Sequence, residues 1–500
     1  MMKKLIGLLL SAVIAAGALA GCATYKNSVD ATGKSIFPAS TYNDSLEVYM
    51  GDVMPFYDDG VMNVYHLQNS TGTNSIFYHP LARITTSDFV HYEDMGIAIN
   101  YEEEVTSTDA AIGTGSFIKD KDGLYHCFYT GHNDQGQEEG LPFNEVIRHA
   151  TSEDQEEWVK DEDFYLYGTE NDFRDPYVYY DEDDGMYYML VTTRVNGAGV
   201  IKRYASESLD ADDAGWTDLG VFFYNDDGTY NMECPSYIEW NGYYYLFYSE
   251  QGDDRVTHYR YKAEKDGEWK KFERDSIDST GFYAGQIEKA GDKVYALAWC
   301  ATLSGGSFDW GGNLVVHELK QASNGELFGV MVSSVKDAIT TDITYRLCDG
   351  APLADNLSFG GDGLSTVCLE KLGRHITRMK FNFTVEDFGG DFGLTFSLDG
   401  PYNGRLGSSL VAFDLKNSAL SCYSDVSSSL RYGPVLASVP FGFAKNREYT
   451  VDVIADGEII SVYLDETVCI TARFSDMVRR NFAFYSNGAQ VNIYGMEFYE

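Results

Sequence analysis

The 500-residue chain has little basic charge and little proline. It carries 37 Lys and Arg against 77 Asp and Glu, a formal net charge of −40, and only 10 Pro beside 49 Gly. Nucleic-acid binders need clustered Lys and Arg to contact phosphates, so this shortage excludes that class of partner. Aromatic residues, by contrast, make up 15% of the chain, and 44% of it is hydrophobic. This composition excludes a disordered chain and favours an all-β fold of short strands and turns.

Long apolar runs are also missing, apart from one at the N-terminus. Two lysines precede an apolar stretch over residues 5–20, which is typical of a secretory signal peptide and too short for an ordinary spanning helix. The stretch ends in Leu-Ala-Gly-Cys, which resembles a bacterial lipoprotein box, so Cys22 is expected to carry a lipid. We predict a lipoprotein signal peptide over 1–21 and a tether over 22–43. The protein would be exported and anchored at the bacterial cell surface, with the lipid as its only membrane contact; a plain signal peptide is the alternative.

Seven cysteines follow Cys22, and no two of them form a Cys-x-x-Cys pair. Several, such as Cys127 and Cys300, lie in apolar or aromatic runs, so buried free thiols are expected for most of them. Because seven is odd, at least one stays unpaired within the chain. The nine histidines show no spacing typical of metal ligands, so we expect neither a metal nor a cofactor.

One pattern occurs five times: a turn with Gly and an acidic or amide residue, followed by an aromatic-rich strand. Such dipeptides are strong signals for a hairpin turn, because both central positions need a positive φ. A short apolar strand precedes each turn, so each repeat opens with a hairpin. A repeat of roughly 50–60 residues is typical of a propeller blade. We therefore predict a five-bladed β-propeller over residues 44–345, with a generic series of sandwich hairpins as the alternative. The turn glycines are Gly60, Gly123, Gly185, Gly242 and Gly291.

The last third of the chain differs in charge and in pattern. Most of the excess acid lies before residue 345, and alternating strands follow, including a hairpin around the Ala-Asp-Gly sequence at 455–457. This pattern is typical of a β-sandwich, which we predict over residues 346–500.

Three carboxylates occupy equivalent places in the repeat. Asp52, Asp175 and Glu233 each stand eight to ten residues before a turn glycine, at the start of the strand. If the first strand of each blade is innermost, all three point into one end of the central channel. Two carboxyl groups across a cleft are the minimum for cleaving a glycosidic bond. Isolated acids at strand ends are usually solvated, but Arg174 beside Asp175 and the apolar neighbours of Glu233 favour a function.

These motifs resemble those of glycoside hydrolase family 32, the β-fructofuranosidases. Residues 173–176 read FRDP and residues 233–235 read ECP, in the family's order, and 112–116 (IGTGS) and 282–286 (FYAGQ) resemble two further segments. The resemblance covers roughly residues 45–500. It implies a five-bladed propeller followed by a β-sandwich, and a retaining hydrolase that releases fructose from β-fructofuranosides such as sucrose, inulin or levan. The partner would be an oligo- or polysaccharide.

The resemblance also implies a role for each matching residue. Asp52 would be the nucleophile, Glu233 the acid/base and Asp175 the transition-state stabiliser. The first motif departs from the family, since Gly51 replaces an Asn expected to touch the sugar and Val53 replaces a Pro. The residues implied to bind the substrate are Gln68, Thr114, Gly115, Ser116, Arg174, Cys234, Tyr283 and Trp299.

Two other functions stay open. An inverting arabinofuranosidase or xylosidase of the related family 43 would share the propeller and the three acids, with its carboxyl groups roughly 6.5–9.5 Å apart instead of about 5–5.5 Å. A non-catalytic surface lipoprotein that binds glycans would fit the altered first motif. The sequence does not determine fructan linkage, chain length, exo or endo attack, or the balance of hydrolysis and transfer.

Overall fold

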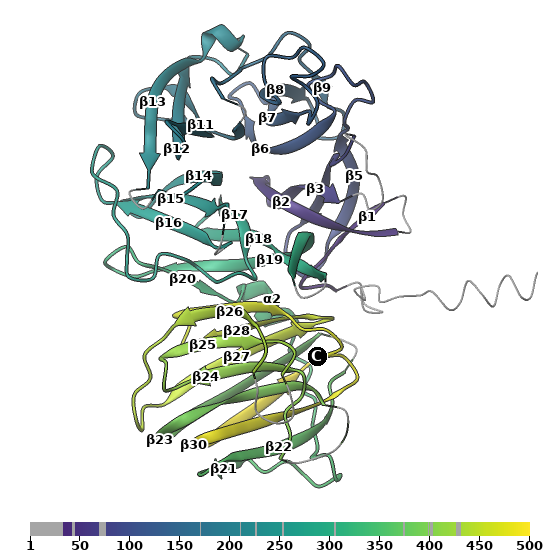
Figure 1. Ribbon diagram of the computed structural model, residues 1–500, viewed down its shortest axis with the longest axis vertical. Coiled ribbons are helices and arrows are strands. Elements are labelled where there is room, and N and C mark those ends of the chain that lie inside the picture. The colour runs from purple at the N-terminus through teal and green to yellow at the C-terminus, as the bar shows by residue number, and fades with distance from the viewer. Residues whose placement is uncertain are drawn as a thin grey trace, which may run out of the picture.

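Two lobes make up the computed structural model, with the strands up to residue 330 in one and those from residue 356 in the other (Figure 1). Apart from strands, regular structure among the described residues is limited to α2 (Ser333–Ala338) and the 3-10 turn η1 (Asp213–Gly215). The prediction of an all-β fold is therefore confirmed. The structure describes residues 34–42, 46–69, 77–170, 172–210, 212–225, 228–252, 255–304, 307–373, 376–398, 400, 404–426 and 432–500. The predicted signal peptide and the predicted lipidation site Cys22 lie outside these residues.

The N-terminal lobe contains five antiparallel units, and each opens with a hairpin, as the repeat predicts. The first strands of the units are β2 (Leu46–Asp58), β6 (Ala111–Lys119), β10 (Phe173–Asp181), β14 (Met232–Trp240) and β17 (Tyr283–Ala290). The second strands are β3 (Val61–Asn69), β7 (Tyr125–His132), β11 (Met186–Val195), β15 (Tyr243–Glu250) and β18 (Lys293–Ser304). The outer strands are β4 (Leu81–Thr86), β5 (Glu93–Ile99), β8 (Glu145–Ser152), β9 (Val159–Lys160), β12 (Ala198–Ser206), β13 (Thr217–Tyr224), β16 (Thr257–Lys262), β19 (Ser307–Gln321) and β20 (Leu327–Val330).

Turn chemistry explains these hairpins. The turn between β2 and β3 has positive φ angles at Asp59 (45°) and Gly60 (86°), and the turn between β14 and β15 has them at Asn241 (49°) and Gly242 (80°). Both central residues of a two-residue hairpin turn need this conformation, which Gly, Asn and Asp adopt at least cost. The local sequence therefore sets where each first strand ends and reverses.

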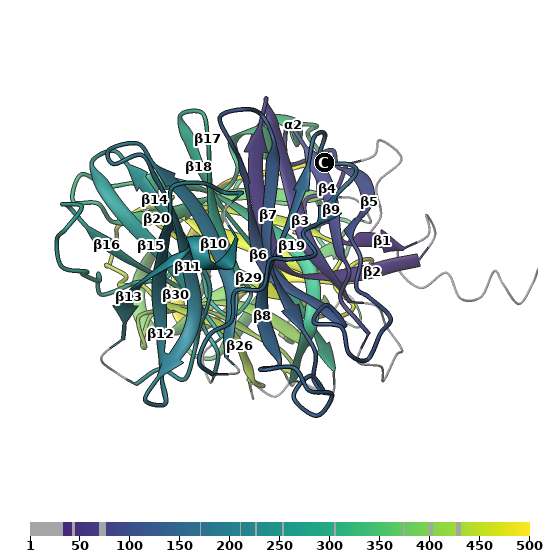
Figure 2. The same cartoon turned by 90° about the horizontal axis from the view of Figure 1, so that it is seen from above.

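The five first strands form a closed ring. β2 lies against β6, β6 against β10, β10 against β14, β14 against β17, and β17 against β2 again. The last unit also joins the first directly, because β19 pairs with β2 at Gly312 and Met50. The first residues of these strands therefore converge on the centre of the lobe. Seen from above, this lobe covers much of the C-terminal lobe (Figure 2).

The segment before β2 is packed rather than free, which differs from the prediction that a tether runs to residue 43. β1 (Ser40–Tyr42) pairs antiparallel with β2. Ile36 and Phe37 are buried, and the Ile36 backbone N–H donates to Asp456 Oδ2 of the C-terminal lobe at 3.0 Å. Any tether must therefore end before Lys34.

The C-terminal lobe is built on two long strands that run through one ten-stranded sheet. β23 (Thr377–Leu398) and β30 (Asn481–Tyr499) pair with each other, and bulges between Val385 and Asp387 and between Phe388 and Asp391 bend β23 without ending it. β24 (Ser409–Asp414), β25 (Ala419–Tyr423) and β26 (Val435–Pro440) branch from one half of β23, whereas β27 (Tyr449–Asp456), β28 (Ile459–Leu464) and β29 (Val468–Arg473) branch from the other. β21 (Asn356–Gly360) and β22 (Leu364–Lys371) pair with β30.

The two branches of this sheet curl toward each other, since β26 and β29 are in contact. The result is nearly a barrel whose layers share the long strands, rather than two separate sheets. The predicted boundary near residue 345 falls in the segment between α2 and β21, and the division into domains stays a prediction.

A buried group of polar side chains, here called the interlobe cluster, joins the lobes: Asp278, His317, Tyr463 and Cys469. His317 Nε2 lies 3.0 Å from Asp278 Oδ2, and His317 Nδ1 lies 3.1 Å from the Tyr463 hydroxyl. Asp278 Oδ1 also accepts from the Thr471 backbone N–H at 2.9 Å. His317 belongs to β19, whereas Tyr463 and Cys469 belong to β28 and β29. These bonds hold the two lobes in one orientation.

Most cysteines are free and buried, as predicted. Cys348 and Cys368 form a disulfide in the C-terminal lobe. The other five described cysteines are buried thiols: Cys127, Cys234, Cys300, Cys422 and Cys469. Within the described part of the chain, no helix is long and apolar enough to cross a membrane.

Candidate active site

Every first strand of the ring contains a β-bulge, in the middle of β2 and nearer the N-terminal end in the other four. In four of them the first residue of the bulge has a positive φ: Asp52 (41°), Asp175 (55°), Cys234 (52°) and Ala284 (52°). In β6 the extra residue of the bulge is Thr114. The left-handed region is unfavourable for residues other than Gly, and such strain concentrates at functional sites. The bulges therefore indicate where the ring departs from ordinary strand packing.

The bulges also give the true alignment of the three acids. Asp52 and Asp175 are equivalent, but Glu233 stands one residue earlier, at the position of Arg174 and Tyr283. The prediction of three equivalent positions is therefore wrong for Glu233. The RDP and ECP motifs align on their prolines, each of which is the second residue of its bulge. Proline suits that position because it has no N–H to donate to the ladder.

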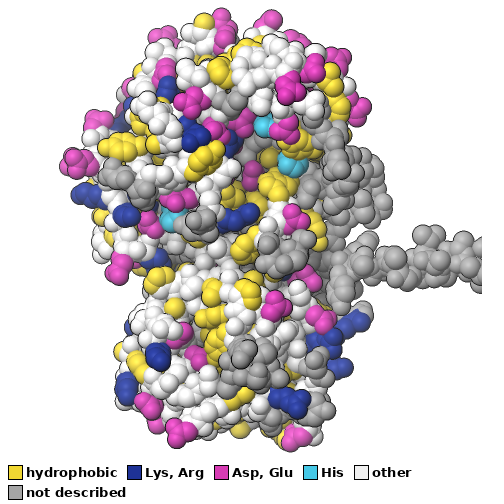
Figure 3. Space-filling view, in the orientation of Figure 1, with side chains coloured by type: hydrophobic (Ala, Val, Ile, Leu, Met, Phe, Trp, Pro, Cys, Tyr) yellow, Lys and Arg dark blue, Asp and Glu magenta, His cyan; other side chains and the backbone are white. Residues whose placement is uncertain are grey.

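A cavity of about 630 Å³ opens at this end of the ring. It is lined by Asp52, Asp175 and Glu233 together, as predicted from the repeat. Figure 3 shows acidic side chains spread over the visible face of both lobes, so surface charge alone does not mark the site. Of the residues implied to bind substrate, four line the cavity: Thr114, Arg174, Cys234 and Tyr283.

The other four implied binding residues do not line the cavity. Gln68 is buried in β3, and its neighbour Leu67 lines the cavity instead. Gly115 allows a close backbone approach, since a Cβ there would lie 2.1 Å from the Phe128 carbonyl oxygen. The Ser116 hydroxyl accepts from the Val178 backbone N–H at 2.8 Å, joining β6 to β10. Trp299 is fully buried and acts on the site through Asp52.

Asp52 is held by two side-chain hydrogen bonds. Thr114 Oγ1 donates to Asp52 Oδ2 at 2.9 Å, and Trp299 Nε1 donates to Asp52 Oδ1 at 3.2 Å. Burial, followed by the charge of Glu233, raises the pKa of Asp52 to about 6, although both hydrogen bonds oppose the shift. The carboxyl group is thus fixed in orientation and ionised above about pH 6.

Asp175 is held through the backbone of neighbouring strands. Its Oδ2 accepts from the Cys234 backbone N–H at 2.9 Å, and its own N–H donates to Thr130 Oγ1 at 2.9 Å. Burial raises the pKa of Asp175, and the Arg174 guanidinium, with Nε 4.0 Å from Oδ2, acts in the opposite direction. This carboxyl group is rigid, almost out of water and close to a fixed cation.

Glu233 lies between an arginine and a tyrosine rather than in the apolar setting that its sequence neighbours suggest. Arg174 Nη2 donates to Glu233 Oε1 at 2.9 Å, and the Tyr283 hydroxyl donates to Glu233 Oε2 at 2.6 Å. These three residues occupy equivalent positions on β10, β14 and β17, so the ring geometry itself brings them together. The aligned bulges therefore create the contact.

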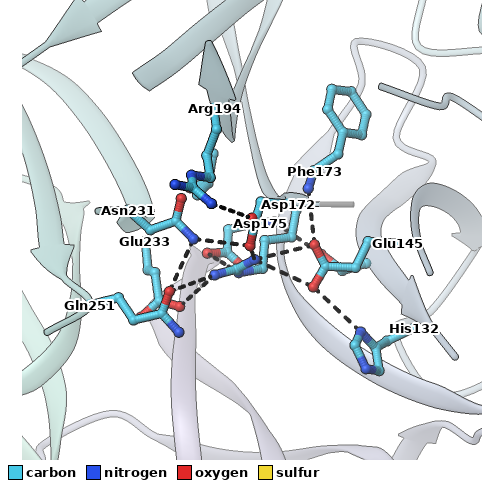
Figure 4. Close-up of polar contacts among 12 residues, drawn as sticks. His132, Glu145, Asp172, Phe173, Asp175, Arg194, Asn231, Glu233 and Gln251 are labelled. Carbon is cyan, nitrogen blue, oxygen red and sulfur yellow. Dashed lines mark hydrogen bonds and ion pairs between the residues drawn. The ribbon is translucent and has the colours of Figure 1, made fainter. Parts of the chain in front are cut away.

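A second tier of side chains, not found from the sequence, orients Arg174. Its Nη1 contacts Glu145 Oε2 at 3.2 Å and Asp172 Oδ1 at 3.0 Å (Figure 4). His132 Nδ1 lies 3.4 Å from Glu145 Oε1, and despite burial its carboxylate partners raise the pKa of His132 to about 9. Arg174 thus contacts three carboxylates, those of Glu145, Asp172 and Glu233, and the amide oxygen of Gln251. These residues carry no local sequence signal, because strand packing alone brings them together.

The unusual first motif has a steric explanation. A Cβ atom on Gly51 would lie 2.5 Å from Trp310 Cζ2, so the indole occupies the space that a larger side chain would need. The Trp310 ring stacks on His79, with centroids 3.9 Å apart, and both residues line the cavity. Where the resembling family places an Asn, this chain has a glycine and an aromatic wall.

Comparison with solved structures shows the class of fold. Three similar structures are the GH32 beta-fructofuranosidase of Bombyx mori, the sucrose-6-phosphate hydrolase of Lactobacillus gasseri and the exo-inulinase of Aspergillus awamori. The identities are 17%, 18% and 15%, and the TM-scores are 0.67, 0.69 and 0.68. The matches cover 94%, 93% and 93% of this chain and 93%, 93% and 97% of the three structures. At such identities the likeness shows a shared fold.

The family follows from the sequence itself. Residues 49–311 match the model described as the glycosyl hydrolases family 32 N-terminal domain. The chain therefore belongs to glycosyl hydrolase family 32. Among curated proteins, no sequence matches it.

Proposed function

We propose that the chain is a retaining glycoside hydrolase that releases fructose from β-fructofuranosides of the sucrose, inulin or levan type. Family membership supports the reaction class. The reaction would take place in a five-bladed propeller (44–345) followed by a β-sandwich (346–500), the organisation that the closed ring of five units supports.

The observation that carries the proposal is the pairing of Asp52 and Glu233. They stand on the first strands of the first and fourth units, line one cavity and are held by different partners. The charge of Glu233 raises the pKa of Asp52, so the two groups interact across that cavity. Two carboxyl groups in such a relation can divide the work of nucleophile and acid/base.

In the proposed mechanism Asp52 attacks the anomeric carbon while Glu233 protonates the leaving oxygen. Thr114 and Trp299 orient Asp52 through its two oxygens, and Tyr283 orients Glu233. Glu233 then removes a proton from water, whose oxygen attacks the anomeric carbon and breaks the bond between that carbon and Asp52. The product keeps its anomeric configuration because two displacements occur.

Asp175 has the third role in this proposal. An oxocarbenium-like transition state is stabilised by a preorganised carboxyl group that need not reorient during the reaction. Asp175 fits because the Cys234 N–H and Arg174 fix it beside the other two acids. Arg174, fixed in turn by Glu145 and Asp172, sets the spacing between Asp175 and Glu233.

The test is sugar release from sucrose, inulin and levan by the wild type and by Glu233→Ala. Glu239→Ala, an exposed residue on the same strand, is the matched control. We expect loss of activity only at Glu233, and equal activity in all three proteins would overturn the assignment. The configuration of the first-formed product, read by NMR, separates a retaining enzyme from an inverting one. Tight fructan binding without turnover would support a glycan-binding protein instead.

We also propose that the protein is exported and anchored by a lipid on Cys22. The lipoprotein box supports this. In cell fractionation, Cys22→Ala should move the protein from the membrane fraction to a soluble one. An unchanged membrane fraction would contradict the anchor.

A further inference from the structure

The cations that line the cavity differ in how they are paired. Arg174 contacts Glu145, Asp172 and Glu233, and the imidazole of His132 contacts Glu145 and Asp134. Arg255 also lines the cavity, yet no ion pair or hydrogen bond joins its guanidinium to another described residue. A guanidinium offers five N–H donors and stays charged, so leaving all of them without a partner is costly unless water or a ligand takes them.

Aromatic rings fix the position of Arg255. Its guanidinium carbon lies 4.7 Å from the centroid of the Tyr283 ring, 5.6 Å from that of Trp299 and 5.8 Å from that of Phe308. Contact with rings orients a planar guanidinium and leaves its N–H edge free to donate. The side chain is therefore preorganised, and no described residue occupies its N–H donors.

The location of Arg255 shows which part of a substrate it would meet. The Tyr283 ring beneath Arg255 carries the hydroxyl that donates to Glu233 at 2.6 Å. In the proposed function Glu233 protonates the leaving oxygen. Arg255 therefore stands beside the leaving group.

We propose that Arg255 binds the leaving sugar by donating N–H bonds to two neighbouring hydroxyl oxygens of the unit next to the cleaved bond. This inference rests on the proposed function and adds a specificity-determining residue to it. A pair of oxygens on adjacent carbons matches two N–H groups of the planar fork, which a lysine ammonium cannot reproduce. The residue acts by binding and takes no part in proton transfer.

The test compares two substrates that share the fructosyl unit. Sucrose has a sugar as leaving group, whereas 4-nitrophenyl β-fructofuranoside has an aryl group without sugar hydroxyls. Hydrogen bonds to a charged group are worth about tenfold to hundredfold in binding. We expect Arg255→Met to lower kcat/KM on sucrose by about that factor, mainly through KM, and on the aryl substrate by at least tenfold less. Arg255→Lys should fall between the wild type and Arg255→Met.

A matched control is Arg203→Met. The Arg203 guanidinium carbon lies 4.8 Å from the centroid of the Tyr188 ring and 5.0 Å from that of Phe222, and Arg203 does not line the cavity. Arg203→Met should not change the ratio of the kcat/KM values for the two substrates. Thermal melting of each variant checks that the fold is intact.

Two outcomes would overturn the inference. An equal loss on both substrates in Arg255→Met would show that the arginine supports the chemistry or the fold rather than the leaving sugar. A displaced pH profile on the aryl substrate would show that its charge acts on Glu233. Failure of the proposed function looks different, because the wild type would then hydrolyse neither substrate, and the inference would fall with it.

Discussion

Two of the buried carboxyl-containing clusters in this molecule are built differently. The interlobe cluster around Asp278 and His317 has no positive φ at any of its four residues, and its ring nitrogens and carboxylate oxygens are all hydrogen-bonded. The cavity cluster around Asp52, Asp175 and Glu233 lies at bulges with strained φ angles.

The cavity cluster also leaves polar groups unsatisfied. Beside Asp172, the buried atoms Arg194 Nε and Asn231 Oδ1 have no hydrogen-bond partner among the described residues. Unpaired buried atoms also occur away from the cavity, for example His66 Nε2 and Trp216 Nε1, so they do not by themselves mark the cavity cluster. The two clusters therefore differ in backbone conformation, even though both contain a buried carboxyl group. The interlobe cluster also brings together an Asp, a His and a Cys within 4.8 Å, yet its bonds are already complete.

Replacing Glu233 by Gln should cause the largest loss of activity. A change in the cavity cluster is thus expected to lower kcat rather than the stability of the fold. The amide keeps the shape and can still accept from Arg174, but it cannot deliver a proton to the leaving oxygen. General acid/base catalysis contributes typically 10²–10⁴-fold, so we expect kcat on sucrose to fall by about that factor. Steady-state kinetics measures it, with unfolding followed in the same samples. A fall of less than tenfold would contradict the assigned role.

Removing Asp278 should show the opposite pattern. Asp278→Ala leaves His317, the Thr471 N–H and the Ser279 N–H without their acceptor in a buried site. Unsatisfied buried groups cost roughly 1–3 kcal/mol each, so we expect a loss of about 3 kcal/mol in unfolding free energy and little change in kcat below the melting range. Urea unfolding measures the loss.

The control for this variant is Asp183→Ala. Asp183 is exposed and pairs with Lys265, which keeps its contact with Asp181, so the removal of Asp183 should change stability by less than about 0.5 kcal/mol. A large drop in kcat for Asp278→Ala at low temperature would show that the interlobe cluster also shapes the active site.

Local chemistry explains how far the sequence could predict this site. The hairpin turns follow from dipeptides such as Asp59-Gly60, and the RDP and ECP motifs place their acids near a bulge with proline. The one-residue shift of Glu233 could not be predicted, because the number of residues between bulge and turn differs among the units. Arg255 and Trp310 were missed because loop and hairpin packing brings them to the cavity.

The C-terminal lobe shows the same limit. Residues 377–398 contain Gly389-Gly390, which separates two alternating segments in the sequence and favours a break between strands. In the structure the strand continues through them. A Cβ on Gly389 would lie 2.1 Å from the Gly488 carbonyl oxygen, so glycine is needed for the close approach to β30. The contact that explains these glycines is between residues about a hundred positions apart.

Asp52→Asn should raise the stability of the protein at neutral pH, whereas Asp278→Ala should lower it. The folded-state pKa of Asp52 is raised from 3.8 to about 6, so folding favours the protonated form, and the penalty for the charge is fully present above about pH 6. A shift of this size corresponds to roughly 2–3 kcal/mol. The uncharged variant should therefore unfold at higher urea than the wild type at pH 7.5, converge with it below about pH 4, and have almost no activity. Equal stability of the variant and the wild type at pH 7.5 would contradict the raised pKa of Asp52.

The smallest expected effect concerns the wall beside Asp52. Gly51→Ala places a Cβ 2.5 Å from Trp310 Cζ2, and the indole can yield only by disturbing its stack on His79. We expect kcat/KM to fall by about tenfold, which is near 1.4 kcal/mol. Trp310→Ala removes the clash, so in the double variant the alanine at 51 should cost almost nothing, a coupling of about 1 kcal/mol in a double-mutant cycle. Additive effects would show that Gly51 is required for its backbone conformation and not because it leaves room for the Trp310 indole. The departure from the family motif would then have a cause other than Trp310.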